Sequence, residues 1–174
     1  MLMRDIVNAV SAKLESTLFG KAAAVPGVSP AGFFAVAPVN SGVATFANMV
    51  KMETDVESAN VNGYTYIMNS GAKGILKTTP KVAGQPIFIL DGSEMNGYPV
   101  LVSNHVAKEL QVGADEFGVL FGDFSQFIIG QWGGIDITVD ALSQAVNGNV
   151  RIVVSAYFDA AKRNASAFAT ASIK

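Results

Sequence analysis

The sequence predicts an α+β fold built from two bodies. Three observations support this class. Apolar residues recur at three- and four-residue spacing over the first nineteen positions. The middle of the chain alternates between helical patterns and short β-favouring runs. Beyond about Asp123 the sequence becomes β-rich, and we place the boundary between the two bodies there.

The opening segment is predicted to be one helix that Gly20 ends. Its apolar face is formed by Met3, Ile6, Val7, Val10, Leu14 and Leu18. The following stretch, 21–38, contains three prolines, so we expect a connection without regular structure. Phe33 and Phe34 are expected to anchor it.

A second helix is predicted from Thr45, as N-cap, to about Ser58. Its buried side should carry Phe46, Met49, Val50 and Val56. Its solvent side should carry Lys51, Glu53, Asp55 and Glu57. A strand, "YTYIMN", should then run into the centre of the body, and Ser70 should cap a short helix weakened by glycine.

Two further strands are expected in the middle section. The first is "QPIFIL", residues 85–90. The second is "YPVLVS", which follows a turn at Asn96 and Gly97 and carries a proline suited to a strand start or a sheet edge.

The final third is predicted to form a hairpin, a long strand and a returning strand. The segments "FSQFIIGQW" and "IDITVD" are expected to pair across a turn at Gly133 and Gly134, with Trp132 covering the hairpin end. Ile135, Ile137 and Val139 would share one face. The run "VRIVVSAYFDA" is predicted as the long strand, and "ASAFATASI" as a strand that returns to a sheet.

Composition argues against several classes of function. Half of the residues are hydrophobic and only 15% are charged, which indicates that something covers the surface. No apolar run approaches the ~18 residues of a membrane span, and Asp5 comes too early for a secretory signal. The net charge is −2 without a basic cluster, which argues against a dedicated DNA reader. The chain has no cysteine, so disulfides and thiolate chemistry are excluded.

We predict no catalytic, cofactor-binding or metal-binding residues. "GAKGILKT" has Leu76 where a phosphate loop needs glycine, and "DGSEMNG" lacks the ligands of a calcium loop. An Asp136 and Asp140 pair is interpreted as a solvated face rather than a glycosidase site. His105 is the only histidine and is interpreted as a surface or helix-start residue.

The order of the motifs resembles that of tailed-phage major capsid proteins. "LFGDFSQFIIGQWGGIDITVD" is similar to the segment in which a Gly-Asp-Phe element leads into a β-hairpin. The helix ending "LFG", the loop with "PAGFF", then "YIMN", "MNGYPVLVSNHV" and an Ala-Phe tail follow in the family's order. The resemblance rests on the collinearity of these motifs over nearly the whole chain rather than on any single motif.

This resemblance implies the Hong Kong 97-type capsid fold. Residues 1–35 and 123–157 would form a peripheral domain, and residues 36–122 and 158–174 an axial domain. Phe121, Phe124 and Phe127 would pack at the junction of the two, with Asp123 held by polar partners. Family members normally have an N-terminal arm and an extended loop before the spine helix. This sequence starts at the helix, so we expect a fragment or a truncated prophage gene that stays monomeric or forms small oligomers alone.

The function implied is that of a structural subunit whose copies form pentamers and hexamers of an icosahedral shell. The shell would enclose DNA without sequence-specific binding and without a membrane. Scaffold, protease and portal proteins are further implied partners, in a virion assembled in the host bacterial cytoplasm. Three alternatives remain open: an encapsulin-like compartment, a β-rich binding module, and a small enzyme built on His105 with Asp91 or Glu94.

Overall fold

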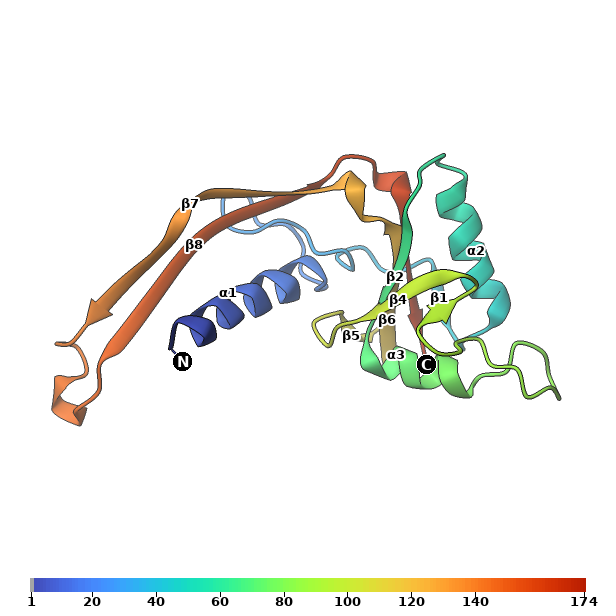
Figure 1. The fold of residues 1–174 in the computed structure, drawn as a ribbon, viewed down its shortest axis with the longest axis horizontal. Coiled ribbons are helices and arrows are strands. Elements are labelled where there is room, and N and C mark those ends of the chain that lie inside the picture. The colour runs from blue at the N-terminus through green and yellow to red at the C-terminus, as the bar shows by residue number, and fades with distance from the viewer. Residues whose placement is uncertain (1) are drawn as a thin grey trace.

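A computed structural model describes residues 2–174, which form a mixed sheet with flanking helices and a long two-stranded arm (Figure 1). The three helices are α1 (Leu2–Leu18), α2 (Phe46–Glu57) and α3 (Ser70–Thr78). The strands of the sheet are β1 (Asn40–Gly42), β2 (Tyr64–Met68), β3 (Glu94–Met95), β4 (Tyr98–Val102), β5 (Lys108–Leu110), β6 (Glu116–Asp123) and β9 (Phe168–Ile173). The arm consists of β7 (Phe127–Asp140) and β8 (Arg151–Lys162).

The strand order in the sheet is β1-β9-β6-β2-β4-β3, and β5 also pairs with β6. β6 runs antiparallel to both β2 and β9, whereas β2 and β4 are parallel. The predicted strand at 64–69 therefore lies inside the sheet, and the predicted return of the chain end is confirmed because β9 pairs with β6. Both predictions rested on apolar, β-favouring residues, and in the structure each of these strands has a neighbouring strand on both sides.

Successive residues of β6 face two different cores, because side chains alternate along a strand. Val119 and Phe121 pack in a core with α2 and α3, which contains Met49, Met52, Tyr66 and Leu76. Leu120 packs on the other face in a second core with Phe33, Phe34, Val106, Ala107 and Leu110. The sheet is thus covered on both faces, and the predicted anchoring role of Phe33 and Phe34 is confirmed.

Helix α1 lies beneath the arm and matches the predicted opening helix (Figure 1). Ile6 and Leu18 are buried, and Val10 and Leu14 are partly buried. Val7 was wrongly assigned to the buried face, since it is 49% exposed at one side of the stripe. The side chain of Met3 lies outside the described part of the structure.

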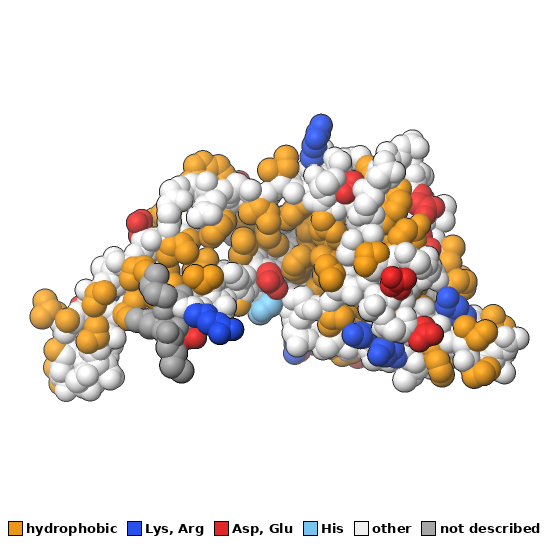
Figure 2. Space-filling view, viewed as in Figure 1, with side chains coloured by type: hydrophobic (Ala, Val, Ile, Leu, Met, Phe, Trp, Pro, Cys, Tyr) orange, Lys and Arg blue, Asp and Glu red, His pale blue; other side chains and the backbone are white. Residues whose placement is uncertain are grey.

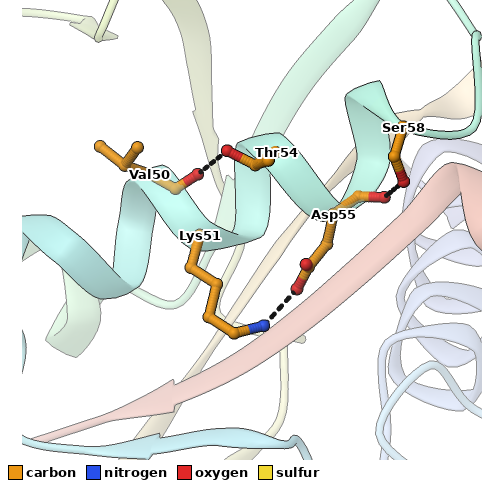
Figure 3. A network of polar contacts seen from close by, with 5 residues as sticks. All are labelled: Val50, Lys51, Thr54, Asp55 and Ser58. Atoms are coloured by element: carbon orange, nitrogen blue, oxygen red, sulfur yellow. Dashed lines mark hydrogen bonds and ion pairs between the residues drawn. The ribbon is translucent and has the colours of Figure 1, made fainter.

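Helix α2 begins after Thr45, whose hydroxyl accepts a hydrogen bond from the Asn48 amide, as predicted. Its solvent face is shown in Figure 3, where Lys51 pairs with Asp55 at 2.8 Å and the Thr54 hydroxyl donates to the Val50 carbonyl at 3.0 Å. The Ser58 hydroxyl donates to the Asp55 carbonyl in the last turn (Figure 3). These exposed contacts each contribute little stability, so the buried face decides where the helix packs.

Two residues of α2 lie on the opposite side from the one predicted. Glu53 was expected in water, but it is buried and its Oε1 accepts hydrogen bonds from the Tyr66 hydroxyl at 2.6 Å and the Asn96 amide at 2.8 Å. These two donors make burial of the carboxylate tolerable. Val50, expected to be buried, is 37% exposed.

Helix α3 is capped by Asn69 rather than by Ser70. The Asn69 side chain accepts a hydrogen bond from the Gly71 amide at 3.0 Å. The same side chain donates to the Val106 carbonyl at 2.8 Å, which links the helix start to the second core. Asn69 is buried, so this position ties the cap to tertiary packing that the sequence pattern does not reveal.

The predicted strand at 85–90 is wrong, because this segment forms only an isolated bridge between Pro80 and Phe88. Its backbone amides bond to the end of α3 instead, with Ile89 donating to Thr79 and Leu90 to Leu76. Ile89 and Leu90 are buried against α3, so the apolar run reflects packing of a loop. The turn at Asn96 and Gly97 is confirmed, and both residues have positive φ.

The predicted hairpin turn at Gly133 and Gly134 is also wrong. β7 continues through both glycines, and the hairpin turn lies at 141–150. The two strands stay paired beyond both glycines, as far as Asp140 and Arg151, so the chain does not reverse there; of the two glycines only Gly133 has a positive φ, at 69°. Residues 133–135 form a bulge opposite Ala156, between the paired positions Trp132–Tyr157 and Asp136–Ser155.

The bulge preserves the pattern of faces along the arm. It adds two residues to β7, and an even number keeps the same set of side chains on the same face. Ile137 pairs with Val154 and Val139 with Ile152, so these apolar residues share one face. Trp132 was predicted to cover the hairpin end, but it lies within β7, opposite Tyr157 and away from the turn.

Candidate functional site

The residues considered for chemistry are not brought together into a reactive centre. His105 is exposed in a turn, where its backbone amide donates to the Ser103 hydroxyl. Within residues 2–174 no hydrogen bond or ion pair connects His105 to Asp91 or Glu94. The described residues also contain no group of three or more His, Asp or Glu side chains placed to hold a metal ion.

Of the two acidic residues considered in the arm, Asp140 has a structural role. Asp140 accepts hydrogen bonds from the Leu142 and Ser143 amides at the start of the hairpin turn, each at 3.0 Å. Hydrogen bonds from Ser143 and Leu142 lower the pKa of Asp140 below its usual value. Asp136 is exposed, paired across the strands with Ser155.

The most organised feature outside the sheet is a cluster of rings at the base of the arm, which we call the aromatic junction. Its members are Phe19, Phe33, Phe124, Phe127 and Phe168. Phe33 stacks on Phe19 with ring centroids 5.9 Å apart and contacts Phe127 at 4.9 Å. It also meets Phe168 edge-on at 5.2 Å. The junction therefore joins the end of α1, the loop after it, the start of the arm and the start of β9.

The expected position of Phe121 is corrected by the structure. Phe124 and Phe127 lie in the aromatic junction as expected, but Phe121 points to the opposite face of β6. There it is fully buried against Tyr64, Tyr66 and Tyr98. Alternation along β6 turns Phe121 toward this core, whereas Phe124 and Phe127 follow β6 in the 3₁₀ helix and in β7 and pack on the other side.

Lys162 lies against the aromatic junction at the end of β8. Its Nζ is 4.4 Å from the centroid of the Phe33 ring, within the range of a cation–π contact. Partial burial of the ammonium group lowers the pKa of Lys162. No sequence pattern indicates this contact, because the two residues are distant in the chain and only the fold brings them together.

Asp123 holds the turn between β6 and the arm. It caps the short 3₁₀ helix at Phe124–Gln126, and its Oδ1 accepts a hydrogen bond from the Ser125 amide at 2.9 Å. Burial acts to raise the pKa of Asp123, but hydrogen bonds from Ser125, Gln126 and Asn62 outweigh it and lower the pKa. The expectation that Asp123 has polar partners is therefore confirmed, and the partners are identified.

The arm exposes many apolar side chains. Ile137, Val139 and Ile152 are 41%, 64% and 36% exposed on the inner face, which is turned toward α1. On the outer face, Trp132 and Tyr157 are 60% and 64% exposed. Figure 2 shows hydrophobic side chains gathered along the arm and at the centre of the molecule. A two-stranded ribbon with such faces is marginally stable in water unless another surface covers it.

A groove of about 960 Å³ lies between α1 and β8. Apolar residues line most of it, including Ile6, Val10, Leu14, Ile152, Val154 and Phe158. Asp5, Lys13 and Asp159 are the charged residues among its lining. The helix and the arm therefore face each other across a space that their own side chains leave open.

Comparison with known proteins shows the family to which this chain belongs. The family whose sequence pattern matches is the phage capsid family, over residues 1–173. The major capsid protein of Halomonas phage phiHAP-1 is 36% identical over 124 residues, which cover 70% of this chain and 19% of that protein. The chain belongs to the phage capsid family.

Solved structures with the same fold include a GTA capsid, a phage structure and an encapsulin complex. The capsid of an empty GTA particle matches 99% of this chain and 65% of that chain, with a TM-score of 0.63 and 17% identity. Gordonia phage Cozz matches with a TM-score of 0.69 and 14% identity, over 98% of this chain and 62% of that chain. The SrpI encapsulin complex from Synechococcus elongatus matches with a TM-score of 0.56 and 15% identity, over 97% and 68%. The predicted α+β capsid fold is confirmed.

The chain spans about two thirds of the length of these structures and about a fifth of the curated phage relative. Membership of a capsid family implies a structural role. No helix in the described residues is long and apolar enough to cross a membrane.

Proposed function

We propose that this chain is the shell-forming part of a major capsid subunit of a tailed phage or prophage. The observation that carries the proposal is the arm, whose inner face is apolar and largely uncovered in a single chain. Surfaces of this kind in soluble proteins are contact surfaces. Copies of one chain that contact each other head to tail form closed rings, and many modest contacts together stabilise a shell.

The domain organisation proposed for the subunit follows the expected boundaries. Residues 1–35 and 123–157 would form the peripheral domain, and residues 36–122 and 158–174 the axial domain. The separate pairing of β7 with β8, away from the sheet, supports a peripheral body, and this pairing continues to Lys162, five residues beyond the proposed boundary at 157. The division is also supported by the aromatic junction, which packs the base of the arm against the start of β9 and the loop after α1.

The proposed partners are copies of the chain in pentamers and hexamers, with scaffold, protease and portal proteins acting during assembly. The shell would enclose DNA, and the weak net charge of −2 suits a wall that does not bind it tightly. Assembly would take place in the host cytoplasm and end in the virion.

An encapsulin-like compartment is the second candidate, because the SrpI encapsulin shares the fold. Such a shell would hold cargo enzymes in place of a genome. The family match and the 36% identical relative both favour a phage capsid. The content of purified particles, nucleic acid or cargo protein, decides between the two.

The test is light scattering coupled to size exclusion, with electron microscopy of any large fraction. The chain would be measured alone over a range of concentrations, and after production together with a full-length capsid protein of the same genome. We expect concentration-dependent small oligomers of the chain alone and its incorporation into rings or shells in the second case. A chain that stays monomeric at every concentration and is excluded from the shells would contradict the proposal.

A further inference from the structure

We propose that Asn147, at the tip of the arm, is a site of spontaneous deamidation. The chain contains three Asn-Gly pairs, at Asn62, Asn96 and Asn147. Asparagine is a thermally labile residue, and a following glycine leaves the next backbone nitrogen unshielded because it has no Cβ. The structure places the three pairs in different surroundings, which predicts different rates.

The reaction needs a free side chain and a free backbone amide. The Gly148 nitrogen loses its proton to water or hydroxide and attacks Cγ of Asn147. A C–N bond forms, the bond from Cγ to Nδ2 breaks, and ammonia leaves with a proton from the solvent. Water then opens the cyclic imide at either carbonyl, which gives aspartate or isoaspartate.

The tip allows this reaction. Residues 141–150 are all exposed, and the Asn147 side chain makes no hydrogen bond within the described residues. The Gly148 amide donates to the Ala145 carbonyl at 3.0 Å, in the short 3₁₀ helix Ala145–Asn147. The Asn147 and Asn149 amides also donate to the Gln144 carbonyl, at 3.0 and 3.2 Å. All residues of this turn are exposed, so its local opening frees the Gly148 amide at little cost.

Asn96 is held in a way that slows the same reaction. Its Nδ2 donates to Glu53 Oε1 at 2.8 Å, and its Oδ1 accepts from Lys81 Nζ at 3.2 Å. Both ends of the side-chain amide are thus fixed, and the attack on Cγ requires both contacts to break. Asn96 is therefore a control within the same chain.

The surroundings of Asn62 predict a deamidation rate between those of Asn96 and Asn147. It is exposed, but Gly63 lies beside the buried Asp123 carboxylate, whose Oδ1 is 3.5 Å from the position that a Gly63 Cβ would take. A neighbouring negative charge opposes loss of the amide proton that starts the reaction. We therefore expect Asn62 to react more slowly than Asn147.

The experiment is incubation of the folded chain in mildly alkaline buffer made with ¹⁸O-labelled water, followed by tryptic peptide mapping. Cleavage after lysine and arginine separates the three pairs into peptides 52–73, 82–108 and 109–151. We expect labelled aspartate and isoaspartate at Asn147 about ten- to hundredfold faster than at Asn96, from the two hydrogen bonds that hold Asn96. The variant Asn147→Ser should lose the conversion in peptide 109–151.

A second incubation in denaturant tests whether the fold sets the rates. There Asn96 and Asn147 should convert at similar rates, since both precede glycine. Equal rates at the two residues in the folded chain, or faster conversion at Asn62 than at Asn147, would overturn the proposal. The inference does not depend on the proposed function, since it rests only on the geometry of the tip.

Discussion

Phe33 is the residue on which the packing of the aromatic junction converges. Its ring contacts rings from the end of α1, the start of the arm and the start of β9, and Lys162 lies on it. We expect Phe33→Ala to lower the free energy of unfolding by about 3–5 kcal/mol, because a buried ring is replaced by a cavity. Urea denaturation followed by fluorescence or circular dichroism measures this change.

The matched control is Phe88→Ala, because Phe88 is 42% exposed in a loop at the other side of the sheet. We expect it to change stability by about 1 kcal/mol or less. Equal losses for the two variants would mean that Phe33 has no special part in joining the arm to the sheet.

Tyr98 provides a pH-dependent contribution to stability. Its hydroxyl donates to Glu57 Oε1 at 2.7 Å, and this hydrogen bond, with some burial and the charge of Glu57, raises the pKa of Tyr98 from 10.0 to about 12. The folded state favours the neutral phenol, so the contribution is complete below about pH 10 and is lost as the pH rises through about 12. Urea midpoints measured across this range should fall less steeply for Tyr98→Phe than for the wild type. Identical slopes would show that the contact does not couple to folding.

At the scale of elements, the bulge at Gly133 and Gly134 allows a matched comparison. A Cβ at either glycine meets no atom within 4 Å, but only Gly133 has a positive φ, at 69°. We expect Gly133→Ala to destabilise the arm by about 1 kcal/mol through backbone strain, and Gly134→Ala to have a smaller effect. Hydrogen exchange at the amides of β7 and β8 measures the opening of the arm directly. Faster exchange in Gly134→Ala than in Gly133→Ala would refute the strain argument.

Helices and strands were predictable from sequence where the spacing of their apolar residues agrees with the face that is buried. The opening helix, α2 with its Thr45 cap, β2, β8 and β9 all lie where periodicity and capping placed them. The predictions of a strand at 85–90 and of a turn at Gly133 and Gly134 were wrong because each sequence pattern is compatible with more than one structure. An apolar run forms a strand or a packed loop, and a glycine pair forms a turn or a bulge, and long-range pairing decides which.

At the scale of the whole molecule, the proposed function predicts an asymmetry between the two faces of the arm. We expect Ile137→Asp to weaken oligomer formation or incorporation into shells strongly, because it places a charge on the apolar inner face. The control is Thr138→Asp, one residue along the same strand but on the outer face. Light scattering measures assembly, and circular dichroism checks that both variants fold. Loss of assembly in Thr138→Asp with none in Ile137→Asp would assign the contact to the other face.

The sequence was less informative about contacts between distant segments. Resemblance predicted the capsid fold and a junction of phenylalanines, but it placed Phe121 on the wrong side of the sheet. Glu53 and Lys162 were missed because charged residues on amphipathic elements are normally solvent-facing. Their partners Tyr66, Asn96 and Phe33 come from other parts of the chain, and only the folded topology shows that they meet.

Because the arm is long, a small rotation at the aromatic junction produces a large displacement of the tip of the arm. A strand of 14 residues extends about 45 Å at about 3.3 Å per residue, so a rotation of about 5° at its base would displace the tip by about 4 Å. Such a rotation would shift rings that pack against the second core, whereas the core with α2 and α3 contains none of them. A small rotation at the base of the arm would therefore let copies of the same chain reach neighbours at slightly different spacings.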